Sequence, residues 1–146
     1  MKLMKLLAVA ALVALPLPAI AADVSVDMLN KHPETNERNV FYPAVVRIDS
    51  GDTVNWLATD RGHNVEFVRG ATPDGVKAFR SKLNKDVSFT FTEPGVYVYK
   101  CTPHYGQGMV GIVVVGDAPA DLQDLRDKRF PGKAGSRIRS MLDEIG

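Results

Sequence analysis

A cysteine, a histidine and a methionine lie within nine residues of one another in the second half of the chain. Cys101, His104 and Met109 form the pattern C-x2-H-x4-M. Thiolate and thioether are soft ligands that suit copper, and two His, one Cys and a weak axial Met define a blue-copper centre. The segment therefore predicts a copper site whose second histidine comes from elsewhere in the chain.

Two other histidines are available for that position. His63 follows Gly62 at the end of a loop and leads into the apolar alternation of Val65-Glu66-Phe67, which a sandwich of strands can bring beside Cys101. His32 lies in the polar stretch Lys31-His32-Pro33-Glu34, where we expect a surface residue. His63 is thus the better candidate for the second imidazole.

Other chemistry is open to some of the same residues. Cys101 and His104 are also the residue types of a nucleophile and its base, but the chain offers no obvious third partner or oxyanion loop, and Met109 would have no role. A structural zinc site is less favoured because a thioether is a poor zinc ligand. Copper sequestration or delivery with the same ligands remains an alternative. We therefore expect a protein that is not an enzyme.

Alternation of apolar and polar residues dominates the stretch from Asp23 to Gly116 and is typical of half-buried strands. About seven short strands in roughly ninety residues imply an all-β sandwich. The turn residues Glu93-Pro94-Gly95 predict a hairpin between the strands that flank them. The predicted strands include Val24 to Met28, Val45 to Ile48, Thr53 to Leu57, Val87 to Phe91, Val96 to Lys100 and the continuously apolar, doubly buried Val110 to Val115.

Helical spacing of apolar residues occurs in three places. It predicts a short helix from Asp74 to Leu83, a helix that starts at Ala118-Pro119-Ala120-Asp121 and ends at Pro131-Gly132, and a helix from Ala134 to Ile145. We expect the last two to pack on the sandwich.

Residues 1–21 have the features of a cleaved secretory signal peptide. Lys2 and Lys5 precede an apolar run, and Ala19-Ile20-Ala21 is a small-x-small cleavage site, with cleavage after Ala22 as an alternative. The run is shorter than the ~20 residues that span a bilayer, so we expect no membrane anchor. With 18 basic and 17 acidic residues, a nucleic-acid binder is disfavoured. One Cys cannot form an intramolecular disulfide, so an exported chain must protect this thiol otherwise.

Five segments resemble the cupredoxins, the type 1 blue-copper family, and among them the pseudoazurins. The resemblance covers the whole predicted mature chain. It implies a cupredoxin-like Greek-key β-sandwich over residues 22–116, followed by two C-terminal α-helices over residues 117–146 packed on the same domain. The segments are Met28-Leu29-Asn30-Lys31, Gly51-Asp52-Thr53-Val54, Gly62-His63-Asn64-Val65, Cys101-Thr102-Pro103-His104-Tyr105 and Gly116-Asp117.

The resemblance also implies a ligand set and a setting. The implied function is a periplasmic one-electron carrier with a role in denitrification, and we expect a monomer because a carrier needs rapid release from its partners. Asn64 is implied to stabilise the Cys101 sulfur and to tie the two loops together. Gln107 and Asn39 depart from the apolar residues of the relatives beside the exposed histidine. The implied ligands of one type 1 copper ion are His63, Cys101, His104 and Met109.

Charge around the exposed histidine would select the partner. Seven basic and four acidic residues lie between Arg61 and Lys100. In the relatives such a basic ring faces acidic redox proteins, such as copper nitrite reductase or a c-type cytochrome. We therefore expect docking near His104 with Lys31, Lys82 and Lys100, although scattered solubilising charges are an alternative interpretation.

Overall fold

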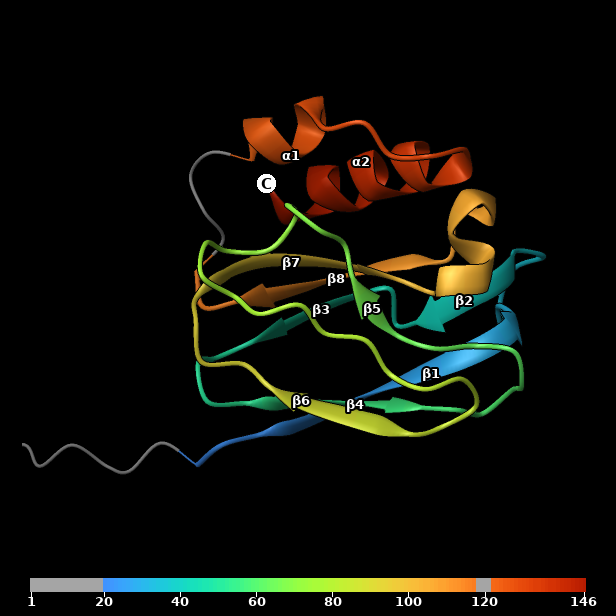
Figure 1. Ribbon diagram of the computed structural model, residues 1–146, viewed down its shortest axis with the longest axis horizontal. Coiled ribbons are helices and arrows are strands. Elements are labelled where there is room, and N and C mark those ends of the chain that lie inside the picture. The colour runs from blue at the N-terminus through green and yellow to red at the C-terminus, as the bar shows by residue number, and fades with distance from the viewer. Residues whose placement is uncertain (1–19, 118–121) are drawn as a thin grey trace, which may run out of the picture.

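Two four-stranded sheets pack face to face, and two helices cover one of them (Figure 1). The computed structural model describes residues 20–117 and 122–146. The first sheet has the order β2-β1-β4-β6 and the second the order β3-β8-β7-β5. The fold is the all-β sandwich with two C-terminal helices that the sequence predicted. The strands are β1 (Asp23–Lys31), β2 (Arg38–Tyr42), β3 (Val45–Ile48), β4 (Thr53–Leu57), β5 (Glu66–Phe67), β6 (Val87–Thr90), β7 (Gly95–Lys100) and β8 (Val110–Val115).

The core lies between the sheets and follows from the alternation. Val54 and Trp56 on β4 point inward, and Tyr97 and Tyr99 on β7 meet them from the other sheet. Trp56 and Tyr99 contact edge to face with ring centroids 5.2 Å apart, a favoured geometry for aromatic pairs. This aromatic packing makes the sandwich a rigid support for the loops at its end.

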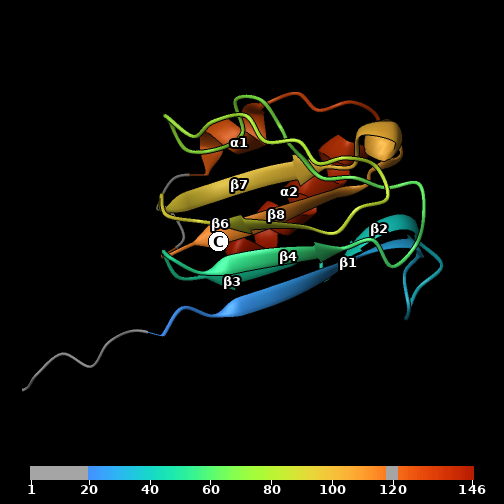
Figure 2. The same cartoon turned by 60° about the horizontal axis from the view of Figure 1, so that its bottom comes forward.

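Strand β8 is buried along its whole length, as its continuous apolar run predicted. Val113 and Val115 face the inter-sheet core, whereas Ile112 and Val114 face the helices. Figure 1 shows the helices over the β7–β8 sheet and the β1–β4 sheet beneath, and in the turned view α2 lies behind β7 and β8 (Figure 2).

Helix α2 (Lys133–Ile145) begins one residue before its predicted start. Its apolar face, which includes Ile138 and Leu142, packs against β8. Helix α1 (Gln123–Asp127) is shorter than predicted, because the backbone becomes extended at Lys128, before Pro131. The predicted start at residues 118–121 and the predicted signal peptide, apart from Ile20 and Ala21, lie outside the described residues. Within the described ranges, no helix has the length and apolarity that a membrane span requires.

The predicted helix at residues 74–83 is wrong. This segment runs extended beside β5, where the amide of Phe67 donates to the carbonyl of Phe79 and the amide of Ser81 donates to the carbonyl of Val65. The ring of Phe79 packs on Phe67, with centroids 5.0 Å apart. Pairing with a strand and insertion of an aromatic side chain into the core therefore outweigh the helical spacing.

The predicted hairpin at residues 93–95 is also wrong, because its two strands belong to different sheets. Strand β6 pairs with β4, and β7 pairs with β8 and β5. Residues 96–99 of β7 are buried on both faces, whereas β6 alternates between half-buried and exposed residues. Strand β7 lies in the sheet that is covered by the helices as well as by the other sheet, whereas β6 lies in the sheet that no described helix covers, so the turn carries the chain from one sheet to the other.

Candidate metal centre

Three of the four predicted ligands converge at one end of the sandwich. The Sγ atom of Cys101 lies 3.7 Å from Nδ1 of His63 and 3.5 Å from Nδ1 of His104, and the two Nδ1 atoms are 3.2 Å apart. Cys101 follows β7 directly, and His104 lies in the 3-10 helix η1 (Thr102–Gln107). His63 comes from the loop between β4 and β5, as predicted. Folding thus brings together residues 38 and 41 positions apart.

These distances fit a common metal ion. Nitrogen and sulfur ligands lie about 2.0–2.3 Å from a metal, so a trigonal set places its donor atoms roughly 3.5–3.8 Å apart. The two sulfur–nitrogen distances fall in this range, and the nitrogen–nitrogen distance is slightly shorter. One soft thiolate and two imidazoles are a donor set that suits copper. The residues present therefore fit a type 1 copper ion.

Asn30 determines which nitrogen of His63 faces the centre. Nε2 of His63 lies 2.9 Å from Oδ1 of Asn30. An amide oxygen only accepts hydrogen bonds, so Nε2 carries the proton and Nδ1 presents its lone pair toward Cys101. The backbone amide of Asn30 in turn donates to Oδ2 of Asp60 at 2.7 Å. Metal-binding histidines commonly donate their second nitrogen in this way.

Burial favours the neutral forms of the metal-free ligands. Burial, and then repulsion by His104, lowers the pKa of His63 below its ordinary value, with a partly opposing effect of Asp60. Burial raises the pKa of the Cys101 thiol, while hydrogen bonds from the backbone of Asn64 and His104 lower it. A neutral imidazole is the form that binds metal. The site thus keeps His63 ready to coordinate.

Asn64 ties the two ligand loops together, as the resemblance implied. Its Oδ1 accepts from the amide of Thr102 at 2.8 Å, and its Nδ2 donates to Oγ1 of the same residue at 3.0 Å. The Thr102 hydroxyl donates to Oε2 of Glu66 at 2.6 Å. This chain of hydrogen bonds fixes the segment that carries Cys101 and His104 against the segment that carries His63.

Met109 lies immediately before β8 and is fully buried, in the same core cluster as Cys101. Its amide donates to the carbonyl of His104 at 3.2 Å, and its carbonyl accepts from the amide of Cys101 at 3.0 Å. Gly108, with φ of +90°, supplies the reversal in front of it. The backbone of Met109 is thus bonded to both ligands of its own loop.

Three residues that hold the site were missed by the sequence reasoning. Asn30 belongs to a segment that resembles the family, but the sequence pattern indicated no role for its side chain. Oδ1 of Asn84 accepts a hydrogen bond from the backbone amide of Gly62 at 2.5 Å, and the backbone amide of Asn84 donates to the carbonyl of His63 at 2.9 Å. Arg137 donates to the carbonyl of Gly108. No local pattern marks any of the three, because each acts across the tertiary fold.

His104 and the three lysines expected around it differ in solvent accessibility. His104 is half-buried, whereas Lys31 and Lys82 are exposed. Lys100 is half-buried, with its Nζ 3.8 Å from Oε2 of Glu66 and 4.6 Å from the centre of the Tyr105 ring. The three lysines therefore do not present equal charge to a partner.

Asn39 and Gln107, the two polar residues that replace apolar residues of the relatives, contact each other. Nδ2 of Asn39 donates to Oε1 of Gln107 at 2.7 Å. Their amides thus pair partly with each other on the surface beside η1. His32, expected at the surface, is half-buried, and its ring packs edge-on against Tyr42 with centroids 5.0 Å apart.

The amino-acid sequence is similar to those of known copper proteins. Residues 27–116 match the sequence model of the copper binding proteins of the plastocyanin/azurin family. The chain is 46% identical over 138 residues to a pseudoazurin of Paracoccus pantotrophus, and this alignment covers 94% of each of the two chains. It is 42% identical over 133 residues to a pseudoazurin of Methylorubrum extorquens, which covers 91% of this chain and 88% of the relative.

A solved structure gives the same comparison in three dimensions. The native pseudoazurin from Hyphomicrobium denitrificans superimposes with a TM-score of 0.79 at 36% identity. The match covers 85% of this chain and 98% of that one. It therefore extends beyond the 27–116 region into the C-terminal part of the chain.

Proposed function

Because the chain belongs to the pseudoazurins, within the plastocyanin/azurin family of copper-binding proteins, we propose that it is a type 1 blue-copper electron carrier. The ligands are His63, Cys101, His104 and Met109. The observation that supports this most directly is the approach of one Sγ and two Nδ1 atoms to within 3.2–3.7 Å of one another. Bound copper would take up one electron as Cu(II) and release it as Cu(I).

The protein's own residues keep the ligand atoms in place between the two oxidation states. Cys101 and Met109 are tied to each other through the backbone, and Asn30 orients His63. The loops hang from a sandwich with a fully buried aromatic core. Ligand atoms that are held in this way move little when one electron is added. A small rearrangement favours fast electron transfer rather than chemistry on a substrate. We therefore assign a carrier role and no enzymatic one.

His104 is the ligand through which electrons enter and leave. His63, Cys101 and Met109 are 0% exposed, whereas His104 is half-buried. Pro103, Gly106 and Gln107 surround its segment and are exposed. A partner that docks on this face reaches copper through one imidazole ring.

Basic side chains line two hollows that include residues next to His104 in the chain or in the same 3-10 helix. Arg80 and Lys82 line a hollow that also contains Pro103, and Arg38 and Lys133 line another that contains Gln107. Positive charge around an exposed ligand steers acidic partners into weak, fast encounters. We propose acidic redox partners, copper nitrite reductase or a c-type cytochrome, met in the periplasm by a monomer exported through residues 1–21.

Copper sequestration or delivery is the second candidate, since it uses the same ligands. The two functions differ in electron exchange. A carrier cycles rapidly with a redox partner while keeping its copper, whereas a delivery protein hands the metal over. The half-buried position of His104, next in the chain to Pro103 of the hollow that Arg80 and Lys82 line, favours the carrier.

The test is spectroscopic and kinetic. The purified protein with one equivalent of Cu(II) should absorb intensely in the visible through thiolate-to-copper charge transfer and give a type 1 electron paramagnetic resonance signal. The Cys101→Ser variant is the control and should be colourless. A colourless copper-loaded wild type would refute the assignment. A blue protein that transfers copper rather than electrons to its partners would favour delivery.

A further inference from the structure

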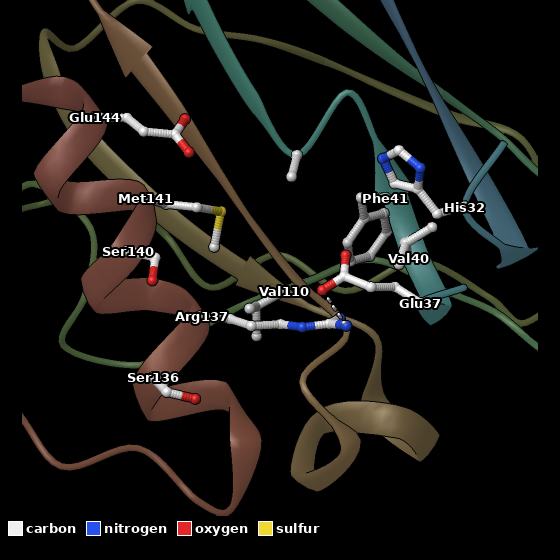
Figure 3. Close-up of a pocket in the computed structure, with 11 residues that line it drawn as sticks. His32, Glu37, Val40, Phe41, Val110, Ser136, Arg137, Ser140, Met141 and Glu144 are labelled. Atoms are coloured by element: carbon white, nitrogen blue, oxygen red, sulfur yellow. Dashed lines mark ion pairs between the residues drawn. The ribbon is translucent and has the colours of Figure 1, made fainter. Parts of the chain in front are cut away.

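Helix α2 reaches the candidate copper loop through one side chain. Nη1 of Arg137 donates to the carbonyl of Gly108 at 2.7 Å, and Nη2 lies 3.2 Å from Oε1 of Glu37. Figure 3 shows Arg137 extending from the helix toward Glu37, past Val110. We propose that Arg137 is a positioning residue that holds the peptide in front of Met109 and so sets how the thioether meets copper. The inference rests on the proposed function.

The peptide between Gly108 and Met109 is bonded at both of its polar groups. Its N–H donates to the carbonyl of His104 at 3.2 Å, inside the ligand loop. Its carbonyl accepts from Arg137 and, at 3.0 Å, from the amide of Val110. A donor that carries a charge makes the stronger bond of such a pair. Arg137 is therefore the contact from outside the loop that sets the tilt of this peptide.

Packing places the helix directly against the loop. A Cβ atom on Gly108 would lie 2.9 Å from Cδ of Arg137 and 3.1 Å from Cβ of Lys133. A Cβ atom on Gly132, just before the helix, would lie 2.3 Å from the carbonyl oxygen of Gly106. Gly132 lets two backbone segments approach this closely, and Gly108 leaves room for the side chains of Arg137 and Lys133. The loop therefore lies in direct contact with the start of α2, with no space for a side chain at either glycine.

Glu37 holds the far end of the guanidinium. It is the last residue before β2, and Asn39 within β2 donates to Gln107. The side chain of Glu37 is 53% exposed, and exposed ion pairs contribute little to stability. The pair therefore orients Arg137 more than it stabilises the fold.

Substitution of Arg137 separates positioning from charge. Arg137→Met keeps an unbranched stem over Gly108 but removes the donors and the charge, whereas Arg137→Lys keeps a charge and a donor. Loss of charge alone would move the reduction potential without altering the symmetry of the copper paramagnetic signal. We expect a changed symmetry in Arg137→Met, a signal nearer wild type in Arg137→Lys, and no change in Arg139→Met, the exposed control on the same helix.

Amide hydrogen exchange provides a readout without copper. In the metal-free protein, Arg137→Met should speed exchange at Met109 and Val110 at least about tenfold, because a hydrogen bond to a charged group is lost. Exchange and signal symmetry equal to those of Arg139→Met would overturn the proposal. If Arg137→Met does not fold, Glu37→Gln should give a smaller change in the same direction, and no change there would count against it.

The two proposals fail in different ways. A wild-type protein that forms no blue centre would refute the copper function, while the exchange rates would still report whether Arg137 holds the loop. A blue wild type whose exchange and signal do not respond to Arg137→Met would refute the positioning role alone.

Discussion

Nε2 of His63 lies 2.9 Å from Oδ1 of Asn30, a residue 33 positions earlier in the chain. The amide oxygen accepts the imidazole proton, so the opposite nitrogen faces Sγ of Cys101. A residue that binds no metal thus sets the protonation state of one that does. Since Asn30 is itself bonded to Asp60, strand β1 and the loop after β4 jointly orient the ligand.

Asn30→Ala should weaken copper binding. Without the acceptor, the ring of His63 loses its fixed tautomer, and loss of such a partner lowers metal affinity about 10–100-fold. Competition with a chelator measures the change. Asn36→Ala, at an exposed position of the segment between β1 and β2, is the control and should bind as wild type. Equal affinity of the two variants would show that Asn30 does not orient the ligand.

Substitutions at Met109 should move the reduction potential in opposite directions. Met109→Gln should retain copper and lower the potential, because an amide oxygen is a harder donor that favours Cu(II). Met109→Leu removes the donor and should raise it. Voltammetry of the two variants beside wild type measures both shifts, and shifts of the same sign would argue against axial ligation.

The metal-free protein should lose stability in acid. Burial and the nearby His104 lower the pKa of His63 below its ordinary value of 6.5, so the unfolded state takes up a proton at a higher pH than the folded state. The contribution is complete above about pH 6.5 and falls as pH decreases, by at most about 1.4 kcal/mol per unit. Denaturant titrations across this range measure it. His63→Gln should show a shallower dependence, and an identical one would contradict the assignment.

Neutralised lysines should slow electron transfer unequally. Lys82→Gln and Lys31→Gln remove exposed charge and should each slow transfer to an acidic partner about two- to fivefold at low salt. Lys100→Gln should have less effect, because Glu66 already offsets that charge at 3.8 Å. Stopped-flow rates at several salt concentrations test this order. Lys128→Gln is the control, because Lys128 directly follows α1 and its Nζ packs against Gly70. Rates insensitive to charge and salt would eliminate electrostatic docking.

Gly111→Ala should destabilise the sandwich. Gly111 faces Tyr99 across the β7–β8 pairing, and a Cβ atom there would lie 2.3 Å from Cζ of that ring. Tyr99 is fully buried against Phe41 and Trp56, so relief requires a core shift, and we expect a loss of at least about 2 kcal/mol. Thermal or denaturant unfolding measures this. Gly106→Ala, where the added carbon meets nothing within 4 Å, should be close to neutral.

Much of the fold was predictable because its signals are local. Period-two alternation placed Val45–Ile48 and Thr53–Leu57 at their observed bounds, and the apolar run at Val110–Val115 predicted a strand covered on both faces. Helical spacing placed α2 to within one residue. Each of these patterns lies within one element, so it needs no knowledge of neighbours.

The same reasoning failed where neighbours decide. At residues 74–83 the apolar spacing matched a helix, but hydrogen bonds to β5 and the packing of Phe79 keep the segment extended. At residues 93–95 the turn chemistry was read correctly, yet the flanking strands pair in different sheets. Local propensity is a small term beside burial and strand pairing.

The sequence by itself determined the chemistry of the site. Cys101, His104 and Met109 lie so close in the chain that one loop must hold all three, and their donor types favour copper. Only the tertiary structure decided how the four ligands are held. Asn30 fixes the proton of His63, Asn64 joins the two ligand loops, and Arg137 bonds to the peptide before Met109. Ligand identity is a property of side chains, whereas orientation depends on hydrogen bonds between segments that meet only when the chain folds.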